Sequence, residues 1–68
     1  MFTVVELRKL RHNQMGHEYE LRYKDSEETK PGYQFHSTYG TTAHVRAVMK
    51  NKCGLNDAEI DLRFAQIE

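Results

Sequence analysis

The residues best suited to chemistry lie in one short stretch, residues 36–44, with the sequence HSTYGTTAH. Several hydroxyls, a glycine and two imidazoles precede a segment with helical periodicity. The first turn of a helix leaves amide groups unpaired and carries the positive end of the dipole, so it favours an anion. A phosphate or a carboxylate would find its ligands among Ser37, Thr38, Thr41, Thr42 and His44.

A plain helix cap explains the same residues with less chemistry. The hydroxyl of Thr41 or Thr42 can accept a hydrogen bond from the first free amides of the helix. The stretch contains neither a Walker motif nor a dinucleotide-binding motif. We therefore rank the cap above the anion site.

Metal binding and catalysis have weaker support. No pair of histidines or cysteines has the spacing of a structural zinc site, and no Cys-x-x-Cys or His-Glu-x-x-His motif occurs. Cys53 is expected near a helix C-terminus, where the dipole raises the pKa of a thiol. A chain of 68 residues also has little room for a pocket that excludes water. The sequence therefore predicts no metal, no cofactor and no enzymatic activity.

Composition indicates one small domain spanning residues 1–68. Hydrophobic residues make up 38% of the chain, charged residues make up 29%, and the formal net charge is zero. This balance excludes disorder by composition and gives no overall attraction to polyanions. The single cysteine cannot form an internal disulfide, and we expect neither a secretory leader nor a membrane-spanning stretch. The expected location is the cytoplasm.

Basic residues are concentrated in two parts of the chain. The compensating acids lie mainly in residues 25–28 and in the C-terminal segment, so a basic side and an acidic side are expected if the fold separates them. A nucleic-acid-binding protein would use the basic residues of the N-terminal hairpin and the first helix. These residues are Arg8, Lys9, Arg11, Arg22, Lys24, Arg46 and Lys50.

The first half of the chain has the alternation of β-strands. In residues 17–24, Tyr19, Leu21 and Tyr23 alternate with charged side chains, which predicts a half-buried strand. Residues 2–11 are rich in β-branched side chains, but their apolar residues change face after Val4. Either both faces are covered or a bulge shifts the register. Residues 33–39 alternate again, after a polar loop with the only proline, and predict a third strand.

The second half of the chain has helical periodicity. Val45, Val48 and Met49 form one apolar stripe of a helix over residues 42–52, with Gly54 as its left-handed C-cap. Asn56 and Glu59 have the spacing of a capping box that opens another helix. The final segment, residues 56–68, fits a helix better than a strand. The predicted fold is α+β in the order βββαα, with βββαβ as the alternative.

The turn around Gly54 also resembles the corner of a helix-turn-helix, but its charges oppose DNA binding. The second helix would present Asp57, Glu59 and Asp61 where a recognition helix approaches phosphates. A structural corner between two packed helices is the better interpretation.

By elimination, we expect a small non-enzymatic protein-interaction or regulatory module. Its sheet edge, its polar loop or its helical face would contact another protein or a second copy of the chain, so a homodimer is one of the expected forms. Nucleic acid is the less favoured partner, and a membrane is not expected.

Overall fold

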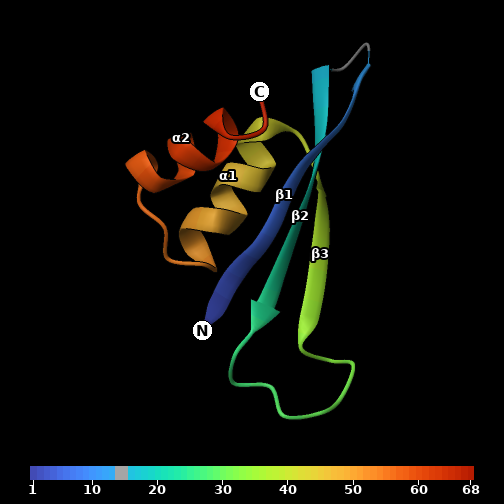
Figure 1. Ribbon diagram of the computed structural model, residues 1–68, viewed down its shortest axis with the longest axis vertical. Helices are drawn as coiled ribbons and strands as arrows, with labels where there is room; N and C mark the ends of the chain where they lie inside the picture. Colours follow the sequence, from blue (N-terminus) through green and yellow to red (C-terminus); the bar gives the residue numbers. More distant parts are fainter. Residues whose placement is uncertain (14–15) are drawn as a thin grey trace.

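The computed structural model describes residues 1–13 and 16–68, so the turn predicted between the first two strands lies partly outside the described residues. Three strands are followed by two helices, which confirms the βββαα prediction (Figure 1). The elements are β1 (Phe2–Asn13), β2 (Gly16–Asp25), β3 (Phe35–Gly40), α1 (Thr42–Asn51) and α2 (Asp57–Ala65).

The strands form one antiparallel sheet in the order β1-β2-β3. Leu21 in the central strand lies opposite Leu7 of β1 on one side and Thr38 of β3 on the other. Pairing between β2 and β3 covers only residues 19–24 of β2, whereas β1 pairs along the whole of β2. The β1–β2 hairpin therefore extends beyond the end of β3.

A bulge in β1 answers the question left open by the sequence. The register shifts between Val4 and Glu6, so Val4 pairs with Tyr23 while Leu7 pairs with Leu21. The additional residue, Val5, lets both Val4 and Leu7 face the core, because a bulge changes which face the following side chains occupy. One face of β1 is thus apolar despite its irregular sequence pattern.

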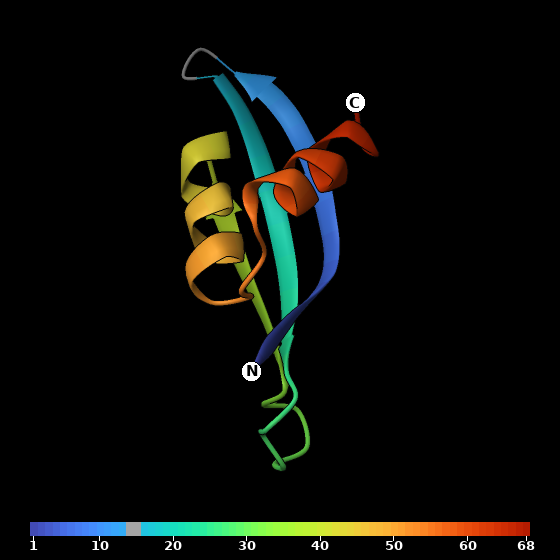
Figure 2. The same ribbon diagram turned by 90° about the vertical axis from the view of Figure 1, so that its left-hand side faces the viewer.

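Both helices cover the same face of the sheet (Figures 1 and 2). The sheet contributes alternate residues of β2 and two residues of β1 to the core, and the helices contribute their apolar stripes. The ring of Tyr19 meets the ring of Phe64 edge to face, with centroids 5.1 Å apart. The buried core residues are Val4, Leu7, Tyr19, Leu21, Tyr23, Val45, Met49, Cys53, Ile60 and Phe64.

The corner between the helices is a structural one. Helix α1 ends at Asn51 with Lys52 as its C-cap, and Gly54 takes a left-handed φ of 68° two residues later. Gly54 is therefore left-handed as predicted, although it lies beyond the C-cap itself. After this chain reversal, the Leu55 N–H donates a hydrogen bond to the Met49 carbonyl oxygen, with 3.1 Å between nitrogen and oxygen. Leu55 is half-buried against the core.

A capping box starts the second helix, as its sequence predicts. The Glu59 N–H donates to Asn56 Oδ1 at 2.8 Å, and the Asn56 N–H donates to Glu59 Oε1 at 3.2 Å. Ile60 and Phe64 are buried, whereas Leu62 is exposed. The helical interpretation of residues 56–68 is therefore correct, and the βββαβ alternative is wrong.

Among the described residues, no helix is both long enough and apolar enough to cross a membrane.

Replacing Gly54 tests the corner directly. An added Cβ at Gly54 would meet no atom within 4 Å, so Gly54→Ala is disfavoured only by the left-handed backbone. We expect this change to lower the free energy of unfolding by about 1 kcal/mol, as measured by urea denaturation. Gly54→Asn is the matched control and should cost less, because Asn tolerates this conformation. Equal stability of Gly54→Ala and the wild type would contradict the corner.

Candidate functional site

No described helix covers the face of the sheet opposite α1 and α2, the open face (Figure 1). Its central residues are Arg22 and Lys24 of β2, which pair with Ser37 and Phe35 of β3. Opposite residues in an antiparallel pair project from the same face, so the aromatic stripe of β3 shares the open face with the charged side of β2. Phe35 is 62% exposed and Tyr39 is 55% exposed. The aromatics of β3 are therefore surface residues.

A shallow hollow of about 310 Å³ lies among these side chains. Val5 reaches it from the bulge of β1, where this side chain remains 50% exposed. The Lys24 Nζ atom lies 5.6 Å from the centroid of the Phe35 ring, within the range of a cation–π contact. The other lining residues are Arg22, His36 and Ser37. The hollow thus combines apolar, aromatic and cationic groups.

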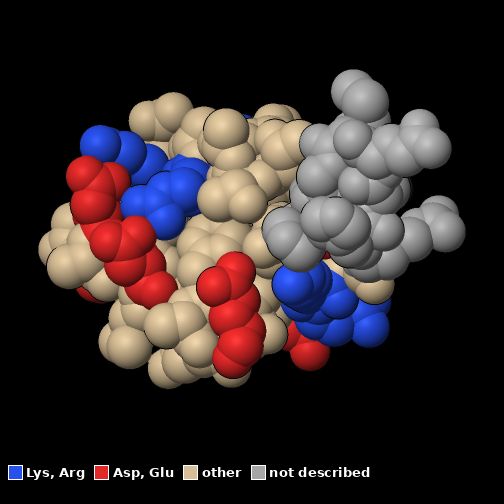
Figure 3. Space-filling model, turned by 90° about the horizontal axis from the view of Figure 1, so that it is seen from above, with Lys and Arg blue, Asp and Glu red and all other residues tan. Residues whose placement is uncertain are grey.

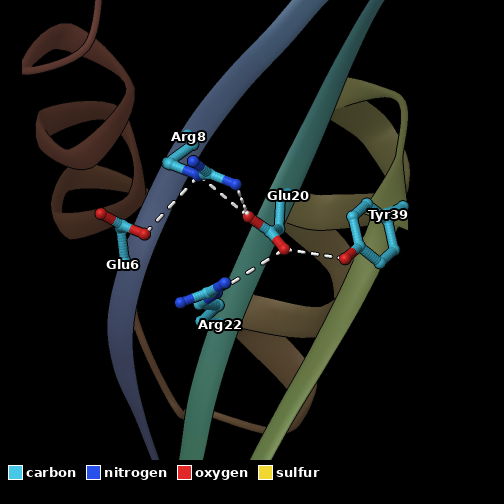
Figure 4. A network of polar contacts seen from close by, with 5 residues as sticks. All are labelled: Glu6, Arg8, Glu20, Arg22 and Tyr39. Carbon is cyan, nitrogen blue, oxygen red and sulfur yellow. Dashed lines mark hydrogen bonds and ion pairs between the residues drawn. The ribbon is translucent and has the colours of Figure 1, made fainter.

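A buried carboxylate occupies the centre of the open face (Figure 4). Glu20 is only 3% exposed because its partners from the flanking strands cover it. Arg8 of β1 donates to Glu20 Oε1, with its Nε at 2.9 Å, and Tyr39 of β3 donates its hydroxyl to Oε2 at 2.8 Å. The Arg22 Nε lies 3.6 Å from Oε2. One carboxylate therefore connects all three strands on the face that the helices leave uncovered.

These partners stabilise the ionised form of Glu20. The hydrogen bond from Tyr39 and then the one from Arg8 hold the pKa of the Glu20 carboxyl below its usual value of 4.5, against the opposing effect of burial. In return, the hydrogen bond and the charge of Glu20 raise the pKa of Arg8. Glu6 adds a longer ion pair to Arg8, at 3.6 Å from its Nε. The network remains ionised at neutral pH.

The helices place basic and acidic residues next to each other. Arg46 of α1 forms an ion pair with Asp61 of α2 at 2.8 Å, and Lys50 lies 3.6 Å from Asp57. Figure 3 shows basic and acidic side chains side by side on the end of the molecule that it displays. The expected division into a basic side and an acidic side is therefore absent where α1 meets α2.

The basic residues of the predicted nucleic-acid surface do not form one stripe. Arg22 and Lys24 belong to the open face, whereas Arg46 and Lys50 lie on α1, beyond the other face. Lys9 is exposed on β1, and Arg8 is engaged with Glu20. The side chain of Arg11 lies outside the described part of the structure.

Hydrogen bonds join three of the five predicted anion-binding residues. Thr41 is the N-cap of α1 and accepts a 3.5 Å hydrogen bond from the His44 N–H, while a 2.9 Å hydrogen bond joins Thr38 Oγ1 to His44 Nε2. A Cβ at Gly40 would lie 2.7 Å from His44 Cδ2, so only glycine allows the imidazole this close. Thr42 is exposed in the first turn, and Ser37 lies on the open face. The arrangement favours the cap, since the polar groups satisfy one another.

Cys53 has the environment of a core residue. It is buried, and burial raises the pKa of its thiol, an effect that Lys52 only partly opposes. Among the residues that the structure describes, no cluster of histidine, cysteine and carboxylate side chains has the arrangement of a metal site.

Comparison with protein-family models, with curated proteins and with solved structures gives no significant match.

Sequence reasoning missed the two residues that organise the open face. Glu20 alternates with core residues like any solvent-facing strand residue, and Tyr39 fits the apolar side of a strand equally well. Their pairing became visible only when the β2–β3 register placed them opposite each other. A carboxylate directly opposite a tyrosine is a recognisable pattern once that register is known.

A pH titration of stability tests the Glu20 network. A carboxyl whose pKa is lowered by folding contributes stability that is fully present above its unfolded pKa and is lost as pH falls through its folded pKa. We expect Glu20→Gln to be less stable than the wild type at neutral pH, with the difference shrinking below pH 4.5 in urea denaturation. Tyr39→Phe keeps the Glu20 carboxyl but removes its hydrogen bond from Tyr39. In this variant, the stability that depends on ionised Glu20 should be lost at a higher pH than in the wild type. A difference between wild type and Glu20→Gln that is independent of pH would contradict the network.

Proposed function

We propose that this chain is a small non-enzymatic protein-interaction module and that the open face of its sheet is the docking surface. The carrying observation is the uncovered apolar and aromatic group of Val5, Phe35 and Tyr39, set beside Arg22 on a sheet whose other face forms the core. The bound partner is another protein, and no cofactor takes part.

The mixture of residues on the open face supports a protein partner. Tyrosine, phenylalanine and arginine are enriched in protein interfaces. Tyrosine and arginine are also enriched among the residues that contribute most to their affinity. Val5 and Phe35 line one hollow, into which an apolar side chain of a partner fits. Of the cations near the hollow, Arg22 lies 3.6 Å from Glu20 Oε2 and Lys24 lies over the Phe35 ring.

The electrostatics favour protein over nucleic acid. Phosphate binding depends on cations that can exchange counterions for phosphates. Here Arg8 and Arg22 face the carboxylate of Glu20, while Arg46 and Lys50 face carboxylates of α2. A phosphate backbone laid across the open face would pass directly over Glu20. This is a poor surface for a polyanion.

Two substitutions on the open face and one on the helices test the docking surface. Val5→Ser and Phe35→Ser should each reduce binding of captured protein partners at least several-fold, yet change the free energy of unfolding by only about 0.5 kcal/mol because both side chains are exposed. Leu62→Ser is the matched control, since Leu62 is 60% exposed on α2. Affinity capture from the native cell, quantified by mass spectrometry, provides the measurement. Proteins retained equally by all the variants would contradict docking on this face.

Titration with mixed-sequence DNA and RNA tests the alternative partner. We expect dissociation constants no tighter than about 10⁻⁴ to 10⁻⁶ M at physiological salt, the range of non-specific binding. A sub-micromolar constant that weakens linearly on a logarithmic salt scale, and that is lost in Arg46→Ala or Lys50→Ala, would make nucleic acid the leading partner.

A further inference from the structure

The outer edge of β3 is an unpaired strand edge. β3 is the last strand of the sheet, and no described strand pairs with its outer edge, while α1 lies over β3 on the helix-covered face (Figure 2). The Asp25 N–H donates to the Gln34 carbonyl oxygen at 2.8 Å. With the β2–β3 register, this bond shows that the backbone groups of His36 and Thr38 point toward β2. Since backbone groups of an antiparallel strand alternate in direction, Phe35, Ser37 and Tyr39 direct their N–H and C=O groups outward.

The two edges of the sheet differ in their protection. The β1 edge carries two register shifts and several charged side chains, both of which hinder pairing with another strand. β3 has the sequence FHSTYG, without a lysine, an arginine, a carboxylate or a proline. Its six residues pair with β2 without a register shift, so the edge is regular. β3 is therefore the edge that is ready to accept a strand.

Ser37 lies midway between the two aromatic residues of β3, Phe35 and Tyr39. In an antiparallel pair of two β3 strands, opposite residues must share a face and must also direct their backbone groups toward each other. The register centred on Ser37 meets both conditions. It places Phe35 opposite Tyr39 of the second copy, and it places the two Ser37 residues opposite each other. All outward N–H and C=O groups of these residues then find partners.

The side chains suit this register as well. On the open face, each Phe35 lies opposite Tyr39 of the second copy, on either side of the small Ser37 side chains at the two-fold axis, so uncharged side chains meet there. On the helix-covered face, His36 lies opposite Thr38 of the second copy. No like charges meet, because β3 has no charged Lys, Arg, Asp or Glu side chain.

We propose that two copies of this chain pair antiparallel through their β3 edges, with Ser37 on the two-fold axis. The three strands of each copy then join in one continuous sheet. The pairing goes beyond the proposed docking function, because it is carried by the backbone edge of β3 and shares with the docking surface only Phe35 and Tyr39, not Val5. It also makes the open faces of the two copies continuous, so the dimer presents two hollows on one surface.

Sedimentation velocity over a range of protein concentrations tests the pairing. The wild type should shift from a mass of 8.0 kDa toward twice that value as concentration rises. Ser37→Pro removes an outward N–H that makes no bond to β2, and edge strands tolerate proline at such positions. Ser37→Lys sets two like charges at the two-fold axis. Both variants should stay monomeric at concentrations where Ala65→Lys, which adds the same charge on exposed α2, still dimerises.

Amide hydrogen exchange measured by NMR locates the interface in the wild type. The amides of Ser37 and Tyr39 should be protected at high concentration and exchange at least tenfold faster on dilution. The inward amides of His36 and Thr38 should be protected at both concentrations, because they bond to β2.

Three outcomes would overturn the edge pairing. These are a wild type that stays monomeric at millimolar concentration, a dimer that persists in Ser37→Lys, and outward amides whose exchange does not depend on concentration. If Ser37→Pro fails to fold, the Ser37→Lys variant and the exchange data still decide. Docking of another protein is tested separately by Val5→Ser, so failure of one proposal leaves the other distinguishable.

Discussion

Burial of only one sheet face is the constraint on which the rest of the structure depends. Two short helices follow the sheet, and their buried residues suffice to cover one face of β1 and β2. The other face must be stable in contact with water, so charged residues of β2 occupy it. The Cα radius of gyration is 12.2 Å, above the roughly 10.9 Å expected for a compact chain of this length, which agrees with a sheet that has a single covering layer.

Much of the fold follows from local patterns in the sequence. Alternation in β2, the stripe of Val45 and Met49, and the Asn56 capping box each depend on residues within one turn or one strand. The local pattern of the second helix is less distinct, because Leu62 also fits the alternation of a strand. Its helical assignment prevails because a capping box and the burial of Ile60 and Phe64 act together, leaving Leu62 on the exposed side.

The features that local patterns did not determine depend on pairing between strands. The bulge at Val5 allows Val4 and Leu7 to face the same core. It depends on how β1 pairs with β2, so the sequence of β1 alone does not show it. Alternation in β3 assigns its residues to two faces, but it does not show which face the helices cover. That choice follows from the register with β2, which sets Phe35 and Tyr39 against its charged side. The open surface is therefore a tertiary property of the sequence.

Glu20 joins this tertiary arrangement to the proposed binding surface. Its carboxylate accepts hydrogen bonds from Arg8 of β1 and Tyr39 of β3, so it holds the flanking strands together from the face that lacks helices. The same contacts fix the orientation of the Arg8 and Tyr39 side chains before any partner arrives. Ordering such side chains on binding normally costs free energy, and a surface that is already ordered avoids this cost. A buried carboxylate on a water-facing sheet thus both stabilises the sheet and orders side chains of the proposed docking surface.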